Sequence, residues 1–328
     1  MMRAPGFWES GGILAWALSP AAAIWTTVVR WKRATRQPER VRIPVICVGN
    51  VTVGGAGKTP TTIAITNRLA AQGWWPDILS RGYGGTETGP LKVDPDQHSA
   101  ADVGDEPLLL ARHADVWVGA DRAASAVRAL ADEADILIMD DGLQHLSLKQ
   151  DLSILVIDGP WGLGNGRVMP AGPLREPLGD ALERCKAVVI IGEDRHGLAE
   201  RVAGQGAAVL HADLNPKPGT MALEGVPVHA FAGIARPEKF FETLRQVGAV
   251  VQRTQSFPDH QVLDPMVVME MLEAATQDGA RLVTTEKDWV RLDTNTRTLA
   301  EPVGVELVFR DWDKLDDLLF SLRSHPGL

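Results

Sequence analysis

A glycine-rich segment limits the possible folds of this chain more than any other feature of its sequence. The segment reads Thr52-Val-Gly-Gly-Ala-Gly-Lys-Thr59 and lies between an apolar run at 43–48 and a stretch of helical periodicity at 58–72. A buried strand, a glycine-rich loop and a helix in this order form a phosphate-binding P-loop. One departure is Thr52, which stands where the usual motif begins with glycine. We therefore expect an α/β fold that binds a nucleotide at this loop.

The loop contains the residue types that suit the phosphates of ATP and a magnesium ion. Its glycines let backbone N–H groups turn toward phosphate oxygens, and the N-terminus of the following helix adds positive potential. Lys58 is placed to reach the β- and γ-phosphates, and the Thr59 hydroxyl to ligate Mg²⁺. The expected nucleotide-binding residues are Thr52, Val53, Gly54, Gly55, Ala56, Gly57, Lys58 and Thr59.

A second motif supplies the acidic residues that phosphoryl transfer needs. The apolar run 136–139 is followed directly by Asp140 and Asp141, with Gln144 and His145 close behind. Ligand sites of α/β proteins lie at the carboxyl ends of parallel strands, so these carboxylates are expected beside the P-loop. Asp140 is the expected second ligand of Mg²⁺, and Asp141 is expected to take part in catalysis.

The rest of the chain alternates short apolar runs with helical stretches, which is typical of a mostly parallel sheet covered by helices. Strands are expected at 43–48, 77–80, 116–118, 136–139, 153–157 and 187–191, with a second series at 228–231, 249–252, 281–284 and 305–309. The segment Asn215-Pro-Lys-Pro-Gly219 interrupts the pattern between the two series. We expect a P-loop NTPase-type three-layer α/β/α domain at 37–222, a smaller C-terminal α/β domain at 223–328, and a hydrophobic membrane-associated helix with a basic flank at 1–36.

The N-terminal prediction rests on 20 consecutive uncharged residues at 10–29. As a helix this run would match the hydrocarbon thickness of a bilayer, although Pro20 and several small polar residues dilute it. Tryptophans flank the run, and four basic residues follow it at 30–36, which favours the cytoplasmic face of a membrane. The alternatives are a buried core helix or a cleaved signal peptide. The signal peptide is disfavoured because signal peptides carry their positive charge before the apolar run, whereas most of the basic residues here follow it.

Charge argues against nucleic acid as a partner. The formal net charge is −9, of which residues 1–42 contribute +5 and the remainder −14, so the body would repel a polyphosphate backbone. Only two cysteines, Cys47 and Cys185, are present, and they form no C-x-x-C pair. This indicates a reducing compartment, with no disulfide framework and no zinc site.

Seven ordered motifs together resemble one family, the tetraacyldisaccharide 4′-kinases of Gram-negative bacteria. The motifs are Thr52–Thr59 with Pro60, Ser80-Arg-Gly-Tyr-Gly84, Gly104-Asp-Glu-Pro107, Asp140-Asp-Gly-Leu-Gln-His145, Pro173-Leu-Arg-Glu176, Phe257-Pro-Asp-His260 and Thr284-Thr-Glu-Lys-Asp288. They cover most of the body, and the hydrophobic N-terminal segment is also similar to a family feature.

The resemblance implies transfer of the γ-phosphate of ATP, with Mg²⁺, to the 4′-hydroxyl of a tetraacyldisaccharide 1-phosphate in lipid A biosynthesis. It places the catalytic body in the cytoplasm at the inner membrane, held peripherally or by one N-terminal anchor through residues 10–36. Asp105 and His260 match the acid–base pair, alongside Lys58 and Asp141. The expected acceptor-binding residues are Arg81, Glu106, Gln144, His145, Arg175 and Glu176. No obligate protein partner is expected.

We also expect closure of the C-terminal unit to bring His260 toward Asp105, because the two are 155 positions apart. Two other functions are weighed against the lipid kinase. A membrane-associated GTPase or ATPase switch is disfavoured because the guanine-reading Asn/Thr-Lys-x-Asp motif is absent. A soluble small-molecule kinase would use the N-terminal run as a core helix.

Overall fold

The large sheet at the centre of the fold has nine strands in the order β13-β8-β7-β6-β1-β5-β2-β4-β3. The structure, a computed structural model, describes residues 5–324. The strands are β1 (Val45–Gly49), β2 (Pro76–Ser80), β3 (Leu91–Lys92), β4 (Val116–Val118), β5 (Ile136–Asp140), β6 (Leu152–Asp158), β7 (Ala187–Ile191), β8 (Ala208–Pro216) and β13 (Val305–Phe309). Neighbours pair in parallel except at the two edges, where β3–β4 and β13–β8 are antiparallel. The predicted, mostly parallel α/β sheet is therefore confirmed.

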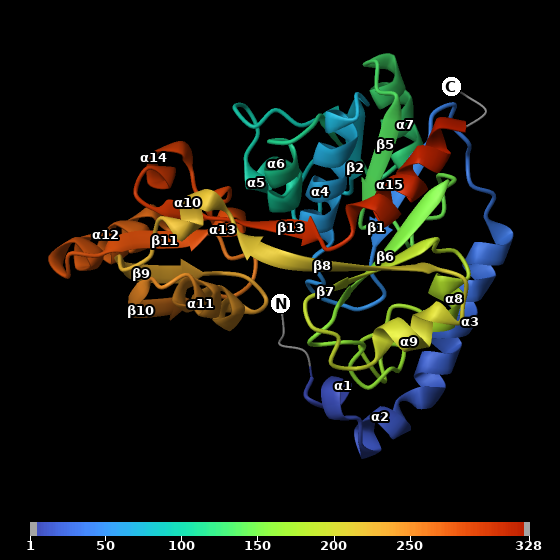
Figure 1. The fold of residues 1–328 in the computed structure, drawn as a ribbon, viewed down its shortest axis with the longest axis horizontal. Helices are drawn as coiled ribbons and strands as arrows, with labels where there is room; N and C mark the ends of the chain where they lie inside the picture. The colour runs from blue at the N-terminus through green and yellow to red at the C-terminus, as the bar shows by residue number, and fades with distance from the viewer. Residues whose placement is uncertain (1–4, 325–328) are drawn as a thin grey trace.

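Helices cover both faces of this sheet (Figure 1). The helices α4 (Lys58–Ala71), α6 (Asp105–Leu110) and α15 (Trp312–Phe320) pack on one face, and α7 (Arg122–Ala131), α8 (Leu178–Leu182) and α9 (Leu198–Ala203) on the other. Successive residues of a strand point to opposite faces. Thus Ile46 and Val48 of β1 join one core, while Val45 and Cys47 join the other. The result is a three-layer α/β/α arrangement.

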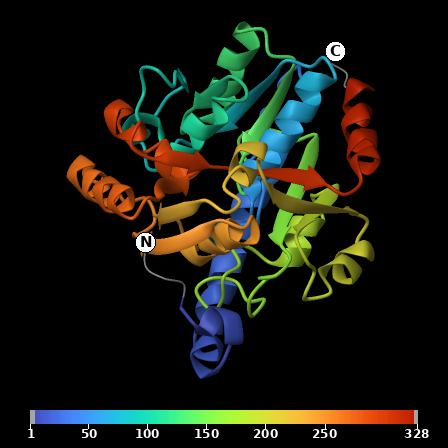
Figure 2. The same cartoon turned by 60° about the vertical axis from the view of Figure 1, so that its left-hand side comes forward.

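A second sheet of four parallel strands, in the order β10-β9-β11-β12, extends from the first (Figure 2). Its strands are β9 (Pro227–Ala232), β10 (Val250–Ser256), β11 (Arg281–Thr285) and β12 (Glu301–Val303). It is packed by α11 (Pro237–Gln246) and α12 (Pro265–Gln277). Short helices complete the body: α5 (Ala100–Val103), α10 (Pro218–Met221), α13 (Glu286–Trp289), α14 (Thr294–Arg297) and the 3₁₀ helix η1 (Ser321–Ser324).

The last strand differs from the expected division of the chain. We placed 305–309 in the smaller domain, but β13 pairs with β8 and becomes an edge strand of the large sheet. Helix α15 follows it onto the same sheet, where Asp316 accepts a hydrogen bond of 2.9 Å from Arg68 Nε of α4. An apolar run predicts a strand but does not say which sheet has an open edge for it. The boundaries at 36/37 and 222/223 stay predictions.

The N-terminal segment is broken into three helices rather than one. These are α1 (Phe7–Ser10), α2 (Ile13–Ala17) and α3 (Ser19–Thr35). Between residues 5 and 324 the structure contains no helix with the length and apolar character needed to cross a bilayer. Helix α3 lies along the body beside α8 (Figure 1). The expected run at 10–29 is interrupted at Gly11 and Gly12, which both have positive φ, at 76° and 107°, and again at Leu18, just before Pro20 in the first turn of α3.

Candidate functional site

The phosphate loop connects the end of β1 to the first turn of α4, as predicted. Gly57 adopts a left-handed conformation with φ of 89° just before Lys58 begins the helix. A Cβ at this position would lie 2.4 Å from Cδ1 of Ile191, so a side chain there would have to displace that methyl group. On the entering side, the N–H of Val53 donates to the carbonyl of Pro173 at 2.9 Å. The loop is thus held between β7 and the segment that contains Pro173.

Lys58 lies between the loop and the acidic motif. Its Nζ donates to Oδ1 of the fully buried Asn50 at 3.3 Å and lies 3.6 Å from Oδ2 of Asp141. Asn50 in turn donates from Nδ2 to Thr52 Oγ1 at 3.2 Å and to the carbonyl of Gly54 at 3.3 Å. The ammonium group is therefore aimed across the loop by side chains on both of its sides.

Asp140 is buried at the carboxyl end of β5 and accepts a hydrogen bond of 2.8 Å from Thr62 Oγ1. Burial, together with the charges of Glu106 and Asp141, raises the pKa of its carboxyl to about 7. A bound cation would stabilise the ionised carboxylate in these surroundings. Asp140 and the half-buried Thr59 offer hard oxygen donors, which suit Mg²⁺ when substrate phosphates complete the coordination. No group of three or more His, Cys, Asp or Glu side chains within the described part of the chain could hold a metal alone.

Asp141 is joined to Arg175, a pairing that the sequence did not predict. Arg175 Nη1 donates to both carboxylate oxygens of Asp141, at 3.0 and 3.1 Å, and to Oε1 of Gln144 at 3.2 Å. Gln144 Nε2 donates to the carbonyl of Asn50 at 2.9 Å and to Glu176 at 3.1 Å. The acidic motif, the Pro173–Glu176 motif and the P-loop therefore meet in one hydrogen-bonded cluster.

Glu176 does not have the position expected of an acceptor-binding residue. Its side chain is 0% exposed, and its carboxylate is bound by Arg33, Arg184 and Gln144. A carboxylate that is fully enclosed cannot contact a sugar that arrives from solvent. The expectation of a direct substrate contact is therefore corrected: Glu176 holds other side chains in place.

Asp105 and His260 are already in contact. His260 Nδ1 lies 3.1 Å from Oδ2 of Asp105, so the closure that we expected to unite them is not needed in this structure. Arg291 donates to the same carboxylate from Nε at 2.7 Å and also from Nη2, and Lys287 Nζ lies 3.8 Å away. Burial alone would raise the pKa of Asp105, but the bond with His260 and the charges of Lys287 and Arg291 hold it well below its usual range.

The remaining predicted residues lie at different distances from this centre. Glu106 accepts a hydrogen bond of 3.1 Å from Lys287, on the same side as Asp105. His145 instead pairs with Ser147 Oγ at 3.0 Å. Arg81 is exposed and has no hydrogen bond or ion pair to any residue at 5–324. The structure thus brings Glu106 to the site. It shows no hydrogen bond or ion pair of Arg81 or His145 with the other predicted site residues within 5–324.

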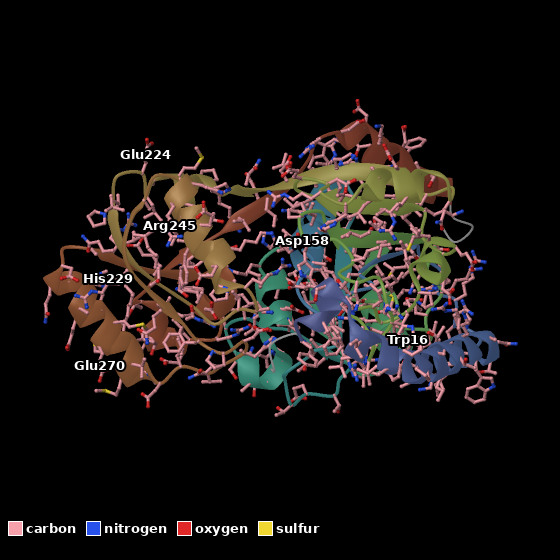
Figure 3. The ribbon with its side chains drawn as sticks, turned by 90° about the horizontal axis from the view of Figure 1, so that it is seen from below. Trp16, Asp158, Glu224, His229, Arg245 and Glu270 are labelled. Carbon is pink, nitrogen blue, oxygen red and sulfur yellow. The ribbon has the colours of Figure 1, made fainter. Side chains whose placement is uncertain are left out.

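Several basic residues of the site were missed from the sequence. Arg236 Nη2 of the smaller unit donates to the carbonyl of Gly55 at 2.8 Å and to Asp158 at 2.9 Å. Asp158 also pairs with Lys239 at 3.4 Å. Figure 3 shows Asp158 between the two units. Arg291 follows the Thr284–Asp288 motif by three residues, which was the only signal for it. Helix α11 gave no such signal, because its basic residues resemble an ordinary solvated face.

Comparisons with known proteins give one consistent result. The family described as Tetraacyldisaccharide-1-P 4′-kinase (LpxK) matches residues 14–323. The tetraacyldisaccharide 4′-kinase of Paramagnetospirillum magneticum is 48% identical over 312 residues, which cover 95% of each chain. That of Gluconobacter oxydans is 47% identical over 325 residues, or 97% of this chain and 98% of the relative.

The fold agrees with a solved member of the same family. The crystal structure of LpxK from Aquifex aeolicus in complex with ATP aligns with a TM-score of 0.76 and 26% identity, covering 94% of this chain and 99% of that chain. The resemblance drawn from the seven ordered motifs is confirmed by these matches. This chain belongs to the tetraacyldisaccharide-1-P 4′-kinase family.

Proposed function

We propose that the cluster around Lys58, Asp141, Asp105 and His260 is the catalytic centre of this kinase. The reaction is transfer of the γ-phosphate of ATP to the 4′-hydroxyl of a tetraacyldisaccharide 1-phosphate, a step of lipid A biosynthesis. The observation that carries the assignment is the contact at 3.1 Å between His260 of the smaller unit and Asp105 of the P-loop unit. The contact supports the assignment because a carboxylate and an imidazole in hydrogen-bond contact can together take the proton of an attacking hydroxyl.

The phosphate loop holds the nucleotide. The positive φ of Gly54 and Gly57 supports a loop whose N–H groups can face phosphate oxygens, and α4 directs its N-terminus at the same point. Lys58 stabilises charge on the transferred group, since its ammonium is aimed by Asn50 and Asp141. Thr59 and Asp140 would hold Mg²⁺, which would supply neutralisation of the phosphate charge.

His260 accepts the proton of the sugar hydroxyl. With the proton on Nδ1 directed at Asp105, the other nitrogen, Nε2, is the acceptor. Asp105 is too weak a base to do this itself, because its pKa is held low by the cations around it. Its ionised carboxylate instead orients the imidazole and stabilises the imidazolium that forms. The acceptor contacts that we propose are Glu106, which pairs with Lys287 on the same side as Asp105, and Arg175, which pairs with Asp141.

The lipid acceptor calls for docking at a membrane, because each methylene taken into water costs about 0.8 kcal/mol. Helices α2 and α3 present large apolar side chains to solvent, among them Ile13 at 90%, Trp16 at 73% and Ile24 at 68% exposure. Figure 3 shows Trp16 on this segment, away from the smaller unit. We assign residues 10–36 to peripheral docking on the cytoplasmic face of the inner membrane, with the exposed Lys32 and Arg36 facing anionic headgroups.

The test is transfer of labelled γ-phosphate to tetraacyldisaccharide 1-phosphate in mixed micelles. We expect Lys58→Ala to lower kcat about 10²- to 10³-fold and Asp105→Ala by about 10²-fold or more. Lys314→Ala, which removes an exposed lysine of α15, is the control. A wild type that hydrolyses nucleotide in a Lys58-dependent manner without modifying the lipid would contradict the proposal and favour the switch-protein alternative.

A further inference from the structure

Helix α3 contacts the active-site cluster at two consecutive residues. Trp25 Nε1 donates to the carbonyl of Arg175 at 3.0 Å, and Arg33 forms an ion pair with the carboxylate of Glu176. On its other side, the N–H of Arg175 donates to the carbonyl of Val51 at 2.6 Å. The segment 175–176 is therefore held between the N-terminal helix and the strand end that leads into the P-loop.

Glu176 is the centre of this connection. Its carboxylate is 0% exposed and is bound by Arg33, by Arg184 Nη2 at 2.9 and 3.0 Å, and by Gln144 Nε2 at 3.1 Å. A buried carboxylate must be compensated by cations and hydrogen bonds, and removal of one partner leaves it poorly compensated. The seating of α3 is thus part of what holds the carboxylate of Glu176 in place.

The position of the Glu176 carboxylate decides which way the amide of Gln144 points. Nε2 faces two acceptors, Glu176 and the carbonyl of Asn50, so Oε1 must face Arg175. Arg175 can then use the same Nη1 to bind Asp141 at 3.0 Å, and Asp141 lies 3.6 Å from Lys58 Nζ. Contacts therefore run without a break from the N-terminal helix to the lysine of the phosphate loop.

We infer that Glu176 is a positioning residue through which the seating of helix α3 sets the geometry of Arg175 and Asp141 beside Lys58. The inference rests on the proposed function, because it assigns catalysis to that cluster and membrane docking to the segment that contains α3. It adds a coupling between the two: a helix that docks on the lipid surface also completes the site. Loss of the Arg33–Glu176 contact should then impair phosphate transfer even where no membrane is present.

The experiment compares Arg33→Gln with Arg30→Gln in detergent mixed micelles. Arg30 lies on the same helix, pairs with Asp180 at 2.7 Å and has a side chain that is 60% exposed. Both variants therefore lose one positive charge, but only Arg33→Gln loses a contact with Glu176. We expect Arg33→Gln to have a kcat between about tenfold and about 10²-fold below that of Arg30→Gln, because small displacements of catalytic groups have effects of this size. The KM for ATP should change little, and Arg33→Lys should recover part of the loss.

A second readout does not depend on activity. Hydrogen exchange should rise at 141–145 and 173–176 in Arg33→Gln but not in Arg30→Gln, while β9 and β11 of the smaller unit stay protected and so show that the chain is folded. Glu176→Gln should raise exchange at the same segments. In the variant that carries both Arg33→Gln and Glu176→Gln, the increase in exchange should be smaller than the sum of the two single increases.

The outcomes separate the two claims. Equal kcat values and unchanged exchange in the two arginine variants would overturn the coupling. Raised exchange in Arg33→Gln, together with a wild type that transfers no phosphate to the lipid, would support the coupling and refute the proposed function.

Discussion

At the scale of single residues, the most unusual group is the buried ion cluster around Asp105. Arg291 binds Asp105 from Nε at 2.7 Å, Asp288 from Nη1 at 2.7 Å and the carbonyl of Gly233 at 2.7 Å. Its side chain is only 5% exposed. Because a buried guanidinium needs full pairing, Arg291 fixes the smaller unit against the P-loop unit at the acid–base pair.

This cluster predicts a pH effect for Arg291→Gln. The charged groups facing Asp105 are His260, Lys287 and Arg291, with Glu106, Asp259 and Asp288 beside them. The wild-type pKa of Asp105 is held well below its usual range. Without Arg291, burial meets less opposition and the pKa rises, so protonation removes the orienting carboxylate at a higher pH. We expect the acidic limb of the kcat/KM profile to shift toward neutral pH.

Arg291→Lys keeps the positive charge and is the matched variant for this measurement. Its acidic limb should stay nearer to that of the wild type than the limb of Arg291→Gln. Parallel losses in both variants at every pH would show that Arg291 is needed for folding alone.

At the scale of elements, the turn from the phosphate loop into α4 depends on one glycine. Alanine at 57 would have to keep a φ of 89° and place its Cβ 2.4 Å from Ile191 Cδ1. The left-handed conformation costs about 1–2 kcal/mol for a residue with a Cβ. A loop that relaxes to avoid this loses its N–H directions, and we expect ATP affinity in Gly57→Ala to fall about tenfold or more by titration calorimetry.

Two further variants identify the cause. Gly57→Ala combined with Ile191→Val removes the atom in contact, so it should recover part of the affinity but not the backbone cost. Gly204→Ala, where φ is −76° and no atom lies within 4 Å of the added Cβ, should bind ATP like the wild type. No recovery with valine would assign the whole effect to the backbone.

The exposed side of α2 is an element-scale feature with its own prediction. Trp16 is 73% exposed, and Phe320 is similarly exposed at 70% but lies in α15, outside the N-terminal segment. We expect Trp16→Ser to weaken binding to vesicles of phosphatidylethanolamine and phosphatidylglycerol, measured by sedimentation, between about tenfold and about 10²-fold, from a loss of about 1.5–3 kcal/mol of apolar burial. Phe320→Ser should not. Equal effects of the two substitutions would argue against a defined docking face.

At the scale of the whole molecule, the chain leaves the large sheet after β8, builds the smaller sheet and then returns. Strand β13 pairs with β8 over five residues, from Val305–Pro216 to Phe309–Ala212. Phe309 is 2% exposed, and its ring lies 4.9 Å from that of Trp312. The smaller unit is therefore attached to the P-loop unit at both of its ends, which limits its movement relative to the phosphate loop.

Phe309→Ala tests this return. Loss of a buried phenylalanine costs about 3–5 kcal/mol, and we expect the loss to appear in the P-loop unit although Phe309 is near the C-terminal end. Hydrogen exchange should rise at β8 and α4 more than at β9 and β11. Phe241→Ala in α11, which removes a ring that is 1% exposed, should show the reverse distribution. Exchange concentrated at β9 in both variants would place β13 energetically with the smaller unit.

The local pattern of the sequence determined much of this protein. Three of its features are local: the glycines followed by Lys58, the apolar runs of strand length, and the acidic residues at a strand end. Each can be recognised from a few neighbouring residues, because steric limits and side-chain burial act locally. The P-loop, the ten expected strands and the family membership could therefore be predicted. Each of those strands is present, with ends shifted by at most a few residues.

Only the tertiary structure decided which distant groups meet. Packing decided whether Glu176 faces a substrate or three side chains of the protein, and whether β13 joins the near or the far sheet. It also decided that Arg291 and Arg236 reach across from the smaller unit. Each of these outcomes depends on which strand edges and charges are left unpaired when the chain packs. Those choices are made by the free energy of the whole fold. A charged residue has the same local signature whether it is solvated or buried against a partner far along the chain.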